Sequence, residues 1–401
     1  MIPPVEAWRR IEARLERLSG ERCPRREALG RVLAAPVRAT VDVPAQDVSA
    51  MDGYVLGAAP QEGKATPVRG VIAAGDAPGL SIEKGDGYRI MTGAPAPEGS
   101  ERIVPIEDTD GGRDSVLVAS AGVAGQHIRR RGEVTEVGDE ILTTGTVISP
   151  ATLGLLATHG HAEVTVFERP SVAFLTGGDE VVAPEETPEP GQLRDSHSDF
   201  FAGACSQLGL DAKALGIAPD SPEAIEQRVT RGLEHDVLLM SGGVSMGEFD
   251  LVEGALEKLG CEILFESVAI QPGKPVVAAR HRGGWVFALP GNPASAMVTF
   301  WLFVRPALRR MMGFEDGYWH GGLQATLGGD APGAKARDLF LAARVTFEDG
   351  RIVATPQRPA GSHDVGAYGV GSALLRIPAR SEPQSVGGSC EVLPLAEWRD
   401  F

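Results

Sequence analysis

Three short loops, rich in glycine and small polar residues, follow apolar runs typical of buried strands. They are TGGDE (176–180), SGGVSMGEFD (241–250) and LPGNPAS (289–295). Glycine lets backbone N–H groups approach an anion closely, and Ser, Thr and Asn add hydrogen-bonding groups without bulk. Neither a Lys-Ser/Thr phosphate loop nor a Gly-x-Gly-x-x-Gly sequence is present. These residues predict a ligand site, but they do not identify the anion that would bind there.

Carboxylates accompany these loops, namely Glu180, Asp250 and, after another candidate strand, Asp220. Acids beside an anion repel it unless a divalent cation bridges them, and Mg²⁺ bound by carboxylates and substrate phosphates is a common solution. The alternative is that each acid only caps a turn or a helix. Asp220, directly before the helix start at Ser221, fits that alternative best.

Three further stretches carry groups suited to phosphate or oxyanion binding. Lys274 lies in a tight turn between two candidate strands, Asp52 lies in SAMDGYVL, and IRRRGE (128–133) contains three arginines. Each stretch also has an ordinary structural interpretation, as a hairpin, a turn or a solvated strand end. No Ser/His/Asp or Cys/His arrangement follows from the spacing, so the sequence does not predict a nucleophile supplied by the protein.

The composition narrows the class of partner. The 401 residues carry a net charge of −16, which argues against nucleic acid or an anionic membrane as the main partner. An anionic ligand would therefore need a locally positive pocket. The four cysteines are scattered, which indicates reduced thiols, and no signal sequence or long apolar run is present. We expect a cytoplasmic protein.

The pattern of helix and strand signals changes along the chain, which predicts several domains. Strand and helix patterns alternate from about residue 169 to 313, which favours a doubly wound, mostly parallel α/β sheet. We expect a helical domain formed by residues 1–42 and 133–168, a β-rich inserted domain at 43–132, the α/β domain at 169–316 and a β-rich C-terminal domain at 317–401.

Local signals support particular elements. Ser149 and Ser221 are suited to cap helices that begin with proline, and Asp349-Gly350 predicts a hairpin turn. Residues 5–18 place Val5, Trp8, Ile11, Leu15 and Leu18 on one helical stripe. That stripe has no obvious partner in the chain.

Taken together, these stretches resemble the molybdopterin molybdenumtransferase family, called MoeA in bacteria, which includes the C-terminal E domain of gephyrin. The resemblance spans residues 40 to 300 or so. It rests on ordered motifs, namely SAMDGY (49–54), RIMTGAPAPEG (89–99), IRRRGE (128–133), TGGDE (176–180), SGGVSMGEFD (241–250), PGKP (272–275) and LPGNPAS (289–295).

The resemblance implies a fold and a reaction. It implies an elongated, four-part subunit with a molybdopterin-binding type of α/β domain, and a homodimer. It also implies an enzyme that inserts molybdate into adenylylated molybdopterin and releases AMP with Mg²⁺. The molybdopterin adenylyltransferase and apo-molybdoenzymes would be partners.

Functional positions are carried over residue by residue. The resemblance implies catalytic roles for Asp52, Glu180, Asp220 and Asp250, of which Glu180 and Asp250 would bind the metal. The residues expected to bind substrate are Thr92, Arg129, Ser241, Gly242, Gly243, Ser245, Lys274, Pro290, Asn292, Pro293 and Ser295.

The chain departs from the family pattern at four positions. Val134 replaces an aspartate, Ser267 and Gln271 replace lysines, and His197 replaces an asparagine. Two alternatives stay open, the first because of these changes and the second because residues 169–313 look like a related single-domain family. One is a catalytically weak paralogue that acts as a cofactor carrier or scaffold. The other is molybdopterin adenylylation, the reaction of a related single-domain family.

Overall fold

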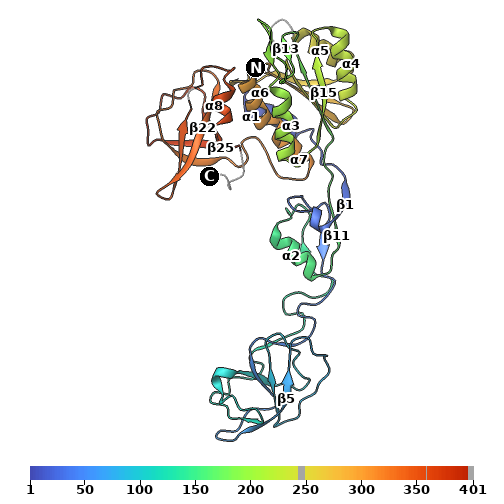
Figure 1. Cartoon of the computed structure of the whole chain (residues 1–401), viewed down its shortest axis with the longest axis vertical. Helices are drawn as coiled ribbons and strands as arrows, with labels where there is room; N and C mark the ends of the chain where they lie inside the picture. The colour runs from blue at the N-terminus through green and yellow to red at the C-terminus, as the bar shows by residue number, and fades with distance from the viewer. Residues whose placement is uncertain (243–248, 358, 396–401) are drawn as a thin grey trace. The chain divides into compact units, whose positions relative to one another are not determined.

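The computed structural model describes residues 1–242, 249–357 and 359–395. The chain forms two compact units, one from Met1–Glu21 with Phe167–Phe401 and the other from Arg22–Val166. Figure 1 shows the order of their elements along the chain. Within those described ranges, no helix combines the length and the apolar character that crossing a bilayer requires.

A six-stranded mixed sheet lies at the centre of the larger unit, in the order β15-β12-β16-β20-β19-β17. The first four strands are parallel, whereas β19 runs antiparallel to both of its neighbours. Because β12, β16 and β20 are buried along nearly their whole length, their sequences are continuously apolar. The predicted mostly parallel sheet is confirmed. The strands are β12 Val172–Gly177, β15 Ala212–Ala218, β16 Val237–Ser241, β17 Glu262–Ser267, β19 Pro275–His281 and β20 Gly284–Leu289.

Helices cover both faces of this sheet (Figure 1). Val172 and Phe174 of β12 pack in one apolar cluster with α1, α3, α6 and α7. The alternate residues Ala173 and Leu175 pack in a second cluster with α4 and α5. This two-sided burial is the doubly wound arrangement that we expected. The helices are α1 Pro4–Glu12, α3 His197–Gln207, α4 Pro222–Gly232, α5 Phe249–Lys258, α6 Pro293–Thr299 and α7 Arg305–Met311, with a π-helical stretch at Phe300–Val304.

The first helix is shorter than its apolar stripe. It ends at Glu12, so the expectation of a helix over 5–18 is wrong in its second half. Leu15 and Leu18 still pack against the core, but from the turn that follows, where the N–H of Leu18 donates to the carbonyl of Met311. The spacing of the apolar residues alone did not distinguish a helix from a turn that packs against the core. The stripe also has a partner after all, because Trp8 and Ile11 are buried against the sheet cluster.

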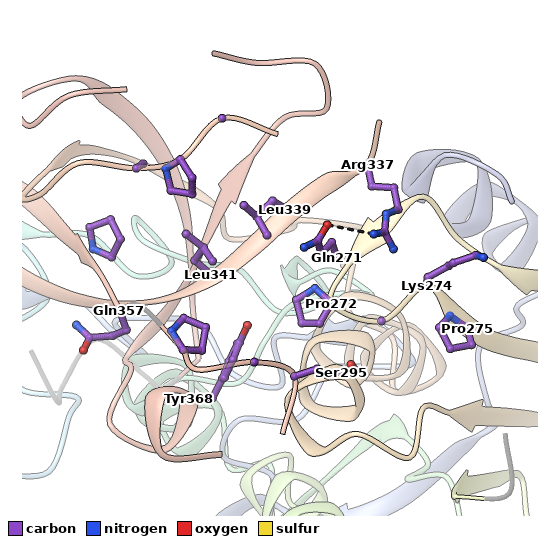
Figure 2. Close-up of a pocket in the computed structure, with 18 of the residues that line it drawn as sticks. Gln271, Pro272, Lys274, Pro275, Ser295, Arg337, Leu339, Leu341, Gln357 and Tyr368 are labelled. Carbon is purple, nitrogen blue, oxygen red and sulfur yellow. Dashed lines mark hydrogen bonds between the residues drawn. The ribbon is translucent and has the colours of Figure 1, made fainter. Parts of the chain in front are cut away.

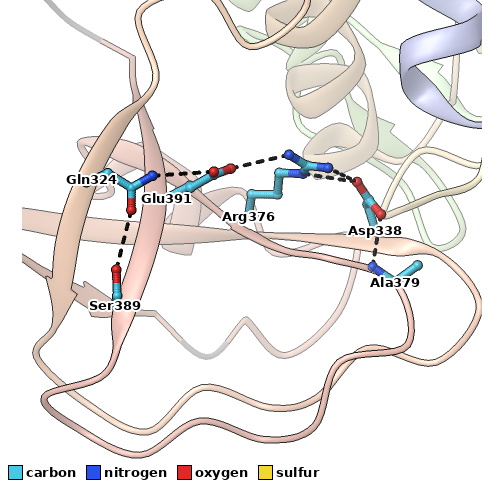
Figure 3. Close-up of polar contacts among 6 residues, drawn as sticks. All are labelled: Gln324, Asp338, Arg376, Ala379, Ser389 and Glu391. Atoms are coloured by element: carbon cyan, nitrogen blue, oxygen red, sulfur yellow. Dashed lines mark hydrogen bonds and ion pairs between the residues drawn. The ribbon is translucent and has the colours of Figure 1, made fainter.

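A closed five-stranded barrel follows the α/β domain. Its strands pair in the ring β22-β23-β21-β25-β24, and β24 returns to β22. On strand β24, Arg376 bridges Asp338 at 3.0 Å and Glu391 at 3.3 Å (Figure 3). Asp349 and Gly350 both have positive φ at the predicted hairpin turn. The strands are β21 Leu323–Leu327, β22 Asp338–Glu348, β23 Arg351–Pro356, β24 Ala373–Ile377 and β25 Ser389–Pro394.

One short strand joins the barrel to the α/β domain. Strand β18, Ile270–Gln271, pairs in parallel with the first residues of β22, so that Ile270 lies opposite Asp338 and Gln271 opposite Leu339. The PGKP turn therefore lies directly beside the barrel wall.

The smaller unit consists mostly of short strands around two separate sets of apolar clusters. A five-stranded sheet, in the order β7-β4-β6-β5-β8, lies in the block expected to be β-rich. The flanking residues contain one α-helix and two strand pairs rather than several helices. The elements are β1 Gly20–Pro24, β2 Val37–Arg38, β3 Val48–Ser49, β4 Gly53–Leu56, β5 Thr66–Ile72, β6 Gly87–Ile90, β7 Arg102–Pro105, β8 Ser115–Val116, β9 Ile128–Arg129, β10 Glu140–Leu142, α2 Pro150–Thr158 and β11 Glu163–Phe167.

Both predicted helix starts are confirmed. The Ser149 hydroxyl accepts from the N–H of Thr152 at the start of α2, and Thr152 returns a hydrogen bond in a capping box. Ser221 accepts from the N–H of Ala224 at the start of α4. Each helix begins with proline directly after its cap, as the sequence predicted.

Candidate functional site

The three glycine-rich loops leave the sheet at the same edge. Thr176 at the end of β12 lies beside Ser241 of β16, which in turn lies beside Leu289 of β20. Gly242 has φ of +85°, and a Cβ there would lie 2.1 Å from the carbonyl oxygen of Gly177. Only glycine fits this approach, so the first two loops are packed backbone against backbone.

Buried polar side chains connect these loops to the start of α3. Asp195 accepts hydrogen bonds from the Thr176 hydroxyl at 2.8 Å, the Ser198 hydroxyl at 2.6 Å and the backbone N–H groups of residues 197 and 198. Burial by itself would raise the pKa of Asp195. The hydrogen bonds from Ser198 and Thr176 outweigh burial, and the pKa lies below its ordinary value.

A second buried contact connects the other two loops. The Ser241 hydroxyl lies 2.6 Å from Nδ1 of His197 and 3.0 Å from the carbonyl oxygen of Pro290. Ser241 is 1% exposed and His197 9% exposed. The Ser241 hydroxyl, which we expected to bind substrate, is therefore already engaged inside the protein.

Candidate metal ligands lie at the ends of β12 and β15. The N–H of Asp179 donates to the carboxylate of Asp220, and the N–H of Asp220 donates to the carboxylate of Asp179. Glu180 follows and is exposed. Gly243 and Ser245 lie outside the described residues, as does the side chain of Asp250 at the start of α5. Among the residues described, no three His, Cys, Asp or Glu side chains are grouped closely enough to hold a metal.

A pocket of about 850 Å³ lies between the PGKP turn and the barrel (Figure 2). Lys274 and Arg337 line it, together with Ser295 of α6 and an apolar wall that includes Leu339 and Tyr368. The residue that replaces the expected lysine, Gln271, accepts a hydrogen bond from Arg337 at 3.1 Å, and the carbonyl of Ile270 accepts a second at 3.4 Å. The two residues of β18, directly before the PGKP turn, thus orient the guanidinium of Arg337.

The remaining expected substrate residues of this unit surround the start of α6. Asn292 is the N-cap residue and is exposed, and Pro293 occupies the first helical position. Ser295 is buried, and its carbonyl accepts from the Thr299 hydroxyl. The structure therefore brings Ser295 to Lys274, and Pro290 to Ser241.

The expected site residues of the smaller unit form their own local contacts. One carboxylate oxygen of Asp52 accepts from the N–H and the hydroxyl of Thr92, at 2.7 Å and 3.0 Å. These two hydrogen bonds, first the backbone and then the side-chain one, lower the pKa of Asp52.

The three arginines of IRRRGE each pair with a carboxylate. Arg129 pairs with Glu133 at 3.0 Å, Arg130 pairs with Asp47 at 2.5 Å, and Arg131 pairs with Asp42 at 2.6 Å. Their charges are largely balanced within the smaller unit. Val134, at the position of the expected aspartate, is 70% exposed.

Sequence reasoning missed three residues of the site. Arg337 lies in the part of the chain without motif matches, and strand pairing alone brings it to Gln271, in the lining of the pocket that Lys274 also lines. His197 drew attention only as a departure from the family pattern, and Asp195, two residues before it, was assigned no role. A buried carboxylate followed by serine and histidine at a helix start was the one available signal.

We expect Asp195→Asn to lower the free energy of unfolding of the larger unit by about 1–3 kcal/mol at neutral pH, because several hydrogen bonds to a buried charge are lost. The depressed pKa stabilises the fold above the ordinary aspartate value of 3.8, and this stabilisation is lost as the pH falls through the folded-state value. The difference between the variant and the wild type should therefore shrink in acid. Urea unfolding followed by tryptophan fluorescence reports on this unit, which contains all five tryptophans.

Thr176→Val is the matched control, since it removes one hydrogen bond to Asp195 and no charge. Its effect at neutral pH should be smaller, and its decrease in acid should be correspondingly smaller, because only one of the hydrogen bonds that lower the pKa of Asp195 is lost. An Asp195→Asn effect that stays constant from neutral pH to acid would contradict the role assigned to this carboxylate.

Comparison with known proteins extends over almost the whole chain. Residues 2–160 match the MoeA N-terminal region (domain I and II), and residues 173–310 match a probable molybdopterin binding domain. Molybdopterin molybdenumtransferase 2 of Mycobacterium tuberculosis is 35% identical over 384 residues, with 93% of this chain and 94% of that protein covered. Molybdopterin molybdenumtransferase of Staphylococcus aureus is 30% identical over 399 residues, with 98% and 95% covered.

A solved structure agrees with these matches. The molybdopterin biosynthesis MoeA protein of Pyrococcus horikosii superimposes with a TM-score of 0.84 at 28% identity, covering 99% of this chain and all of that one. The resemblance inferred from the motifs is confirmed, and the chain belongs to the molybdopterin molybdenumtransferase (MoeA) family of molybdenum cofactor biosynthesis.

Proposed function

We propose that this protein inserts molybdate into adenylylated molybdopterin and releases AMP. The presence of both Lys274 and Arg337 in the lining of one pocket carries the proposal. In a chain with a net charge of −16, two basic residues in the lining of one pocket favour a small oxyanion or a phosphate. The guanidinium can donate two parallel hydrogen bonds to such a group, and the lysine adds a point charge.

The surroundings of the pocket suit the rest of the substrate. Its volume of about 850 Å³ is sufficient for a ligand larger than an oxyanion, and its apolar wall offers a surface for a flat ring. The loop after β20 supplies backbone N–H groups at the same end of the α/β domain. These features support a substrate that combines a ring system with phosphates.

Magnesium fits the donors available at the ends of β12 and β15. Asp220 and Glu180 offer carboxylate oxygens, which Mg²⁺ prefers, and the hydrogen bonds between Asp179 and Asp220 hold these loops together. We propose that Asp220, Glu180 and Asp250 hold the ion. When bound, it would neutralise charge on the phosphates during AMP release.

Gln271 favours one alternative function. A glutamine in place of lysine leaves the pocket with Lys274 and Arg337 as its basic residues, and Asp330 offsets part of that charge. A protein with weaker anion binding could hold the cofactor or act as a scaffold rather than turn it over. Gln271 also orients Arg337, however, and this contact favours a working oxyanion site.

The family relationship also leads us to propose partners. The molybdopterin adenylyltransferase would supply the adenylylated substrate, and apo-molybdoenzymes would receive the product. We propose that these encounters take place in the cytoplasm.

The decisive assay measures AMP release from adenylylated molybdopterin with Mg²⁺, with and without molybdate. We expect release that depends on molybdate. Lys274→Ala and Arg337→Ala should each raise the molybdate KM by about tenfold to hundredfold, since each removes a charge-assisted contact. Lys213→Ala removes the same charge from the exposed edge strand β15 and should change nothing. Tight binding of the substrate without release would instead support the carrier.

We expect Asp250→Asn to abolish Mg²⁺-dependent AMP release while the circular dichroism spectrum stays unchanged, because the neutral side chain no longer binds the cation. Glu257→Gln, an exposed acid on the same helix α5, is the matched control and should retain full activity. Unchanged turnover in Asp250→Asn would remove this residue from the metal site.

We also propose a homodimer, now on the family resemblance alone, because the stripe of α1 is covered within the chain. Light scattering at micromolar concentration should give twice the chain mass of 42.2 kDa. A monomer under those conditions would exclude the dimer as the resting state.

A further inference from the structure

His197 occupies an unusual position for a histidine. Its ring is buried where the loops after β16 and β20 meet the start of α3, and Nδ1 lies 2.6 Å from the Ser241 hydroxyl. Its other nitrogen, Nε2, is buried and has no hydrogen-bond partner among the described residues. The family resemblance predicts asparagine at this position, so the titratable ring is a feature of this chain.

The contacts of Ser241 determine which nitrogen carries the proton. The hydroxyl has one hydrogen, and both Nδ1 of His197 and the carbonyl of Pro290 lie within its reach. If Nδ1 lacked a proton, two acceptors would compete for that hydrogen and one would stay unsatisfied. If Nδ1 is protonated, it donates to Ser241, and Ser241 donates to Pro290. The neutral ring with its proton on Nδ1 therefore satisfies all three groups.

We infer that neutral His197 is a positioning residue that holds Ser241 and Pro290, at the ends of β16 and β20, in the arrangement that binds substrate, and that its protonation breaks this arrangement. The inference rests on the proposed function, since these strand ends are where the substrate would bind. Protonation would place a hydrogen on Nε2, where no acceptor is present among the described residues. The charged ring is then stable only where water reaches it, away from this junction.

The groups around the His197 ring determine the direction in which its pKa shifts. Burial lowers the pKa of His197 below its ordinary value of 6.5, and Asp195 partly opposes that shift. Among the described residues, Asp195 is the charged group that acts on the ring, while Ser241, Pro290 and Phe201 contribute no charge. The neutral form of His197 thus predominates at neutral pH. Its contact with Ser241 is lost as the pH falls through the lowered pKa of His197.

Two substitutions separate positioning from simple packing. The amide nitrogen of asparagine is bonded to Cγ as Nδ1 of histidine is, so His197→Asn can donate the same hydrogen bond without titrating. His197→Phe fills a similar volume but donates nothing. His235, near the opposite end of β16, is the control, since its buried Nδ1 also has no hydrogen-bond partner in the described part of the chain.

The kinetic experiment measures kcat/KM for AMP release against pH. Wild type should lose kcat/KM in acid along a titration below pH 6.5. His197→Asn should keep its activity at neutral pH and lose that acid limb, whereas His197→Phe should raise KM by about tenfold at every pH. His235→Asn should match wild type throughout. An unchanged acid limb in His197→Asn, or a wild-type KM in His197→Phe, would overturn the inference.

A second experiment needs no substrate and so separates this inference from the proposed function. Imidazole nitrogen shifts from NMR report the tautomer, and His197 is identified among the eight histidines by its loss in His197→Asn. We expect a proton on Nδ1 in wild type and a shift towards the Nε2–H form in Ser241→Ala. A proton on Nε2 in wild type would refute the inference even if AMP release occurs.

Discussion

The register of the parallel strands determines where the other groups of the larger unit can lie. Because Thr176, Ser241 and Leu289 occupy neighbouring positions, three loops leave the sheet together. Their backbones approach so closely that a Cβ at Gly242 would overlap the carbonyl oxygen of Gly177. The buried carboxylate of Asp195 then faces the Thr176 hydroxyl, and His197 reaches Ser241. Shifting β16 by a single residue would displace Ser241 from Thr176, Leu289 and His197 together.

Several arginines of this acidic chain form ion pairs with nearby carboxylates. The arginines of the smaller unit are paired with carboxylates, and Arg376 of the barrel is shared between two acids. Arg337 differs, because it is oriented by neutral oxygens of Ile270 and Gln271 rather than by a carboxylate. Its charge therefore remains largely available in the pocket beside Lys274. Neutral acceptors can thus orient a cation without cancelling it.

The sequence was informative where function depends on local pattern. Buried apolar runs located the strands, parallel topology placed their loops at one edge, and prolines after serine marked the starts of α2 and α4. It was not informative about Arg337, which lies 66 residues from Gln271 and reaches it only through the pairing of β18 with β22. His197 and Ser241 are 44 residues apart, and no spacing rule connects them. The extent of α1 was misjudged because Leu15 and Leu18 contact the same core from a turn.

The pairing of β18 with β22 has a consequence for how such proteins can be recombined. Residues 270 and 271 are separated in sequence from the barrel, yet they form part of its sheet, and Gln271 lines the pocket together with Arg337. A barrel grafted from a relative would bring its own counterpart of Arg337 but not the acceptors that orient it. A chimeric protein would therefore keep the pocket only if the two-residue strand, the turn after it and the barrel all came from the same parent. These segments belong together because they are in contact, although they are not contiguous in the chain.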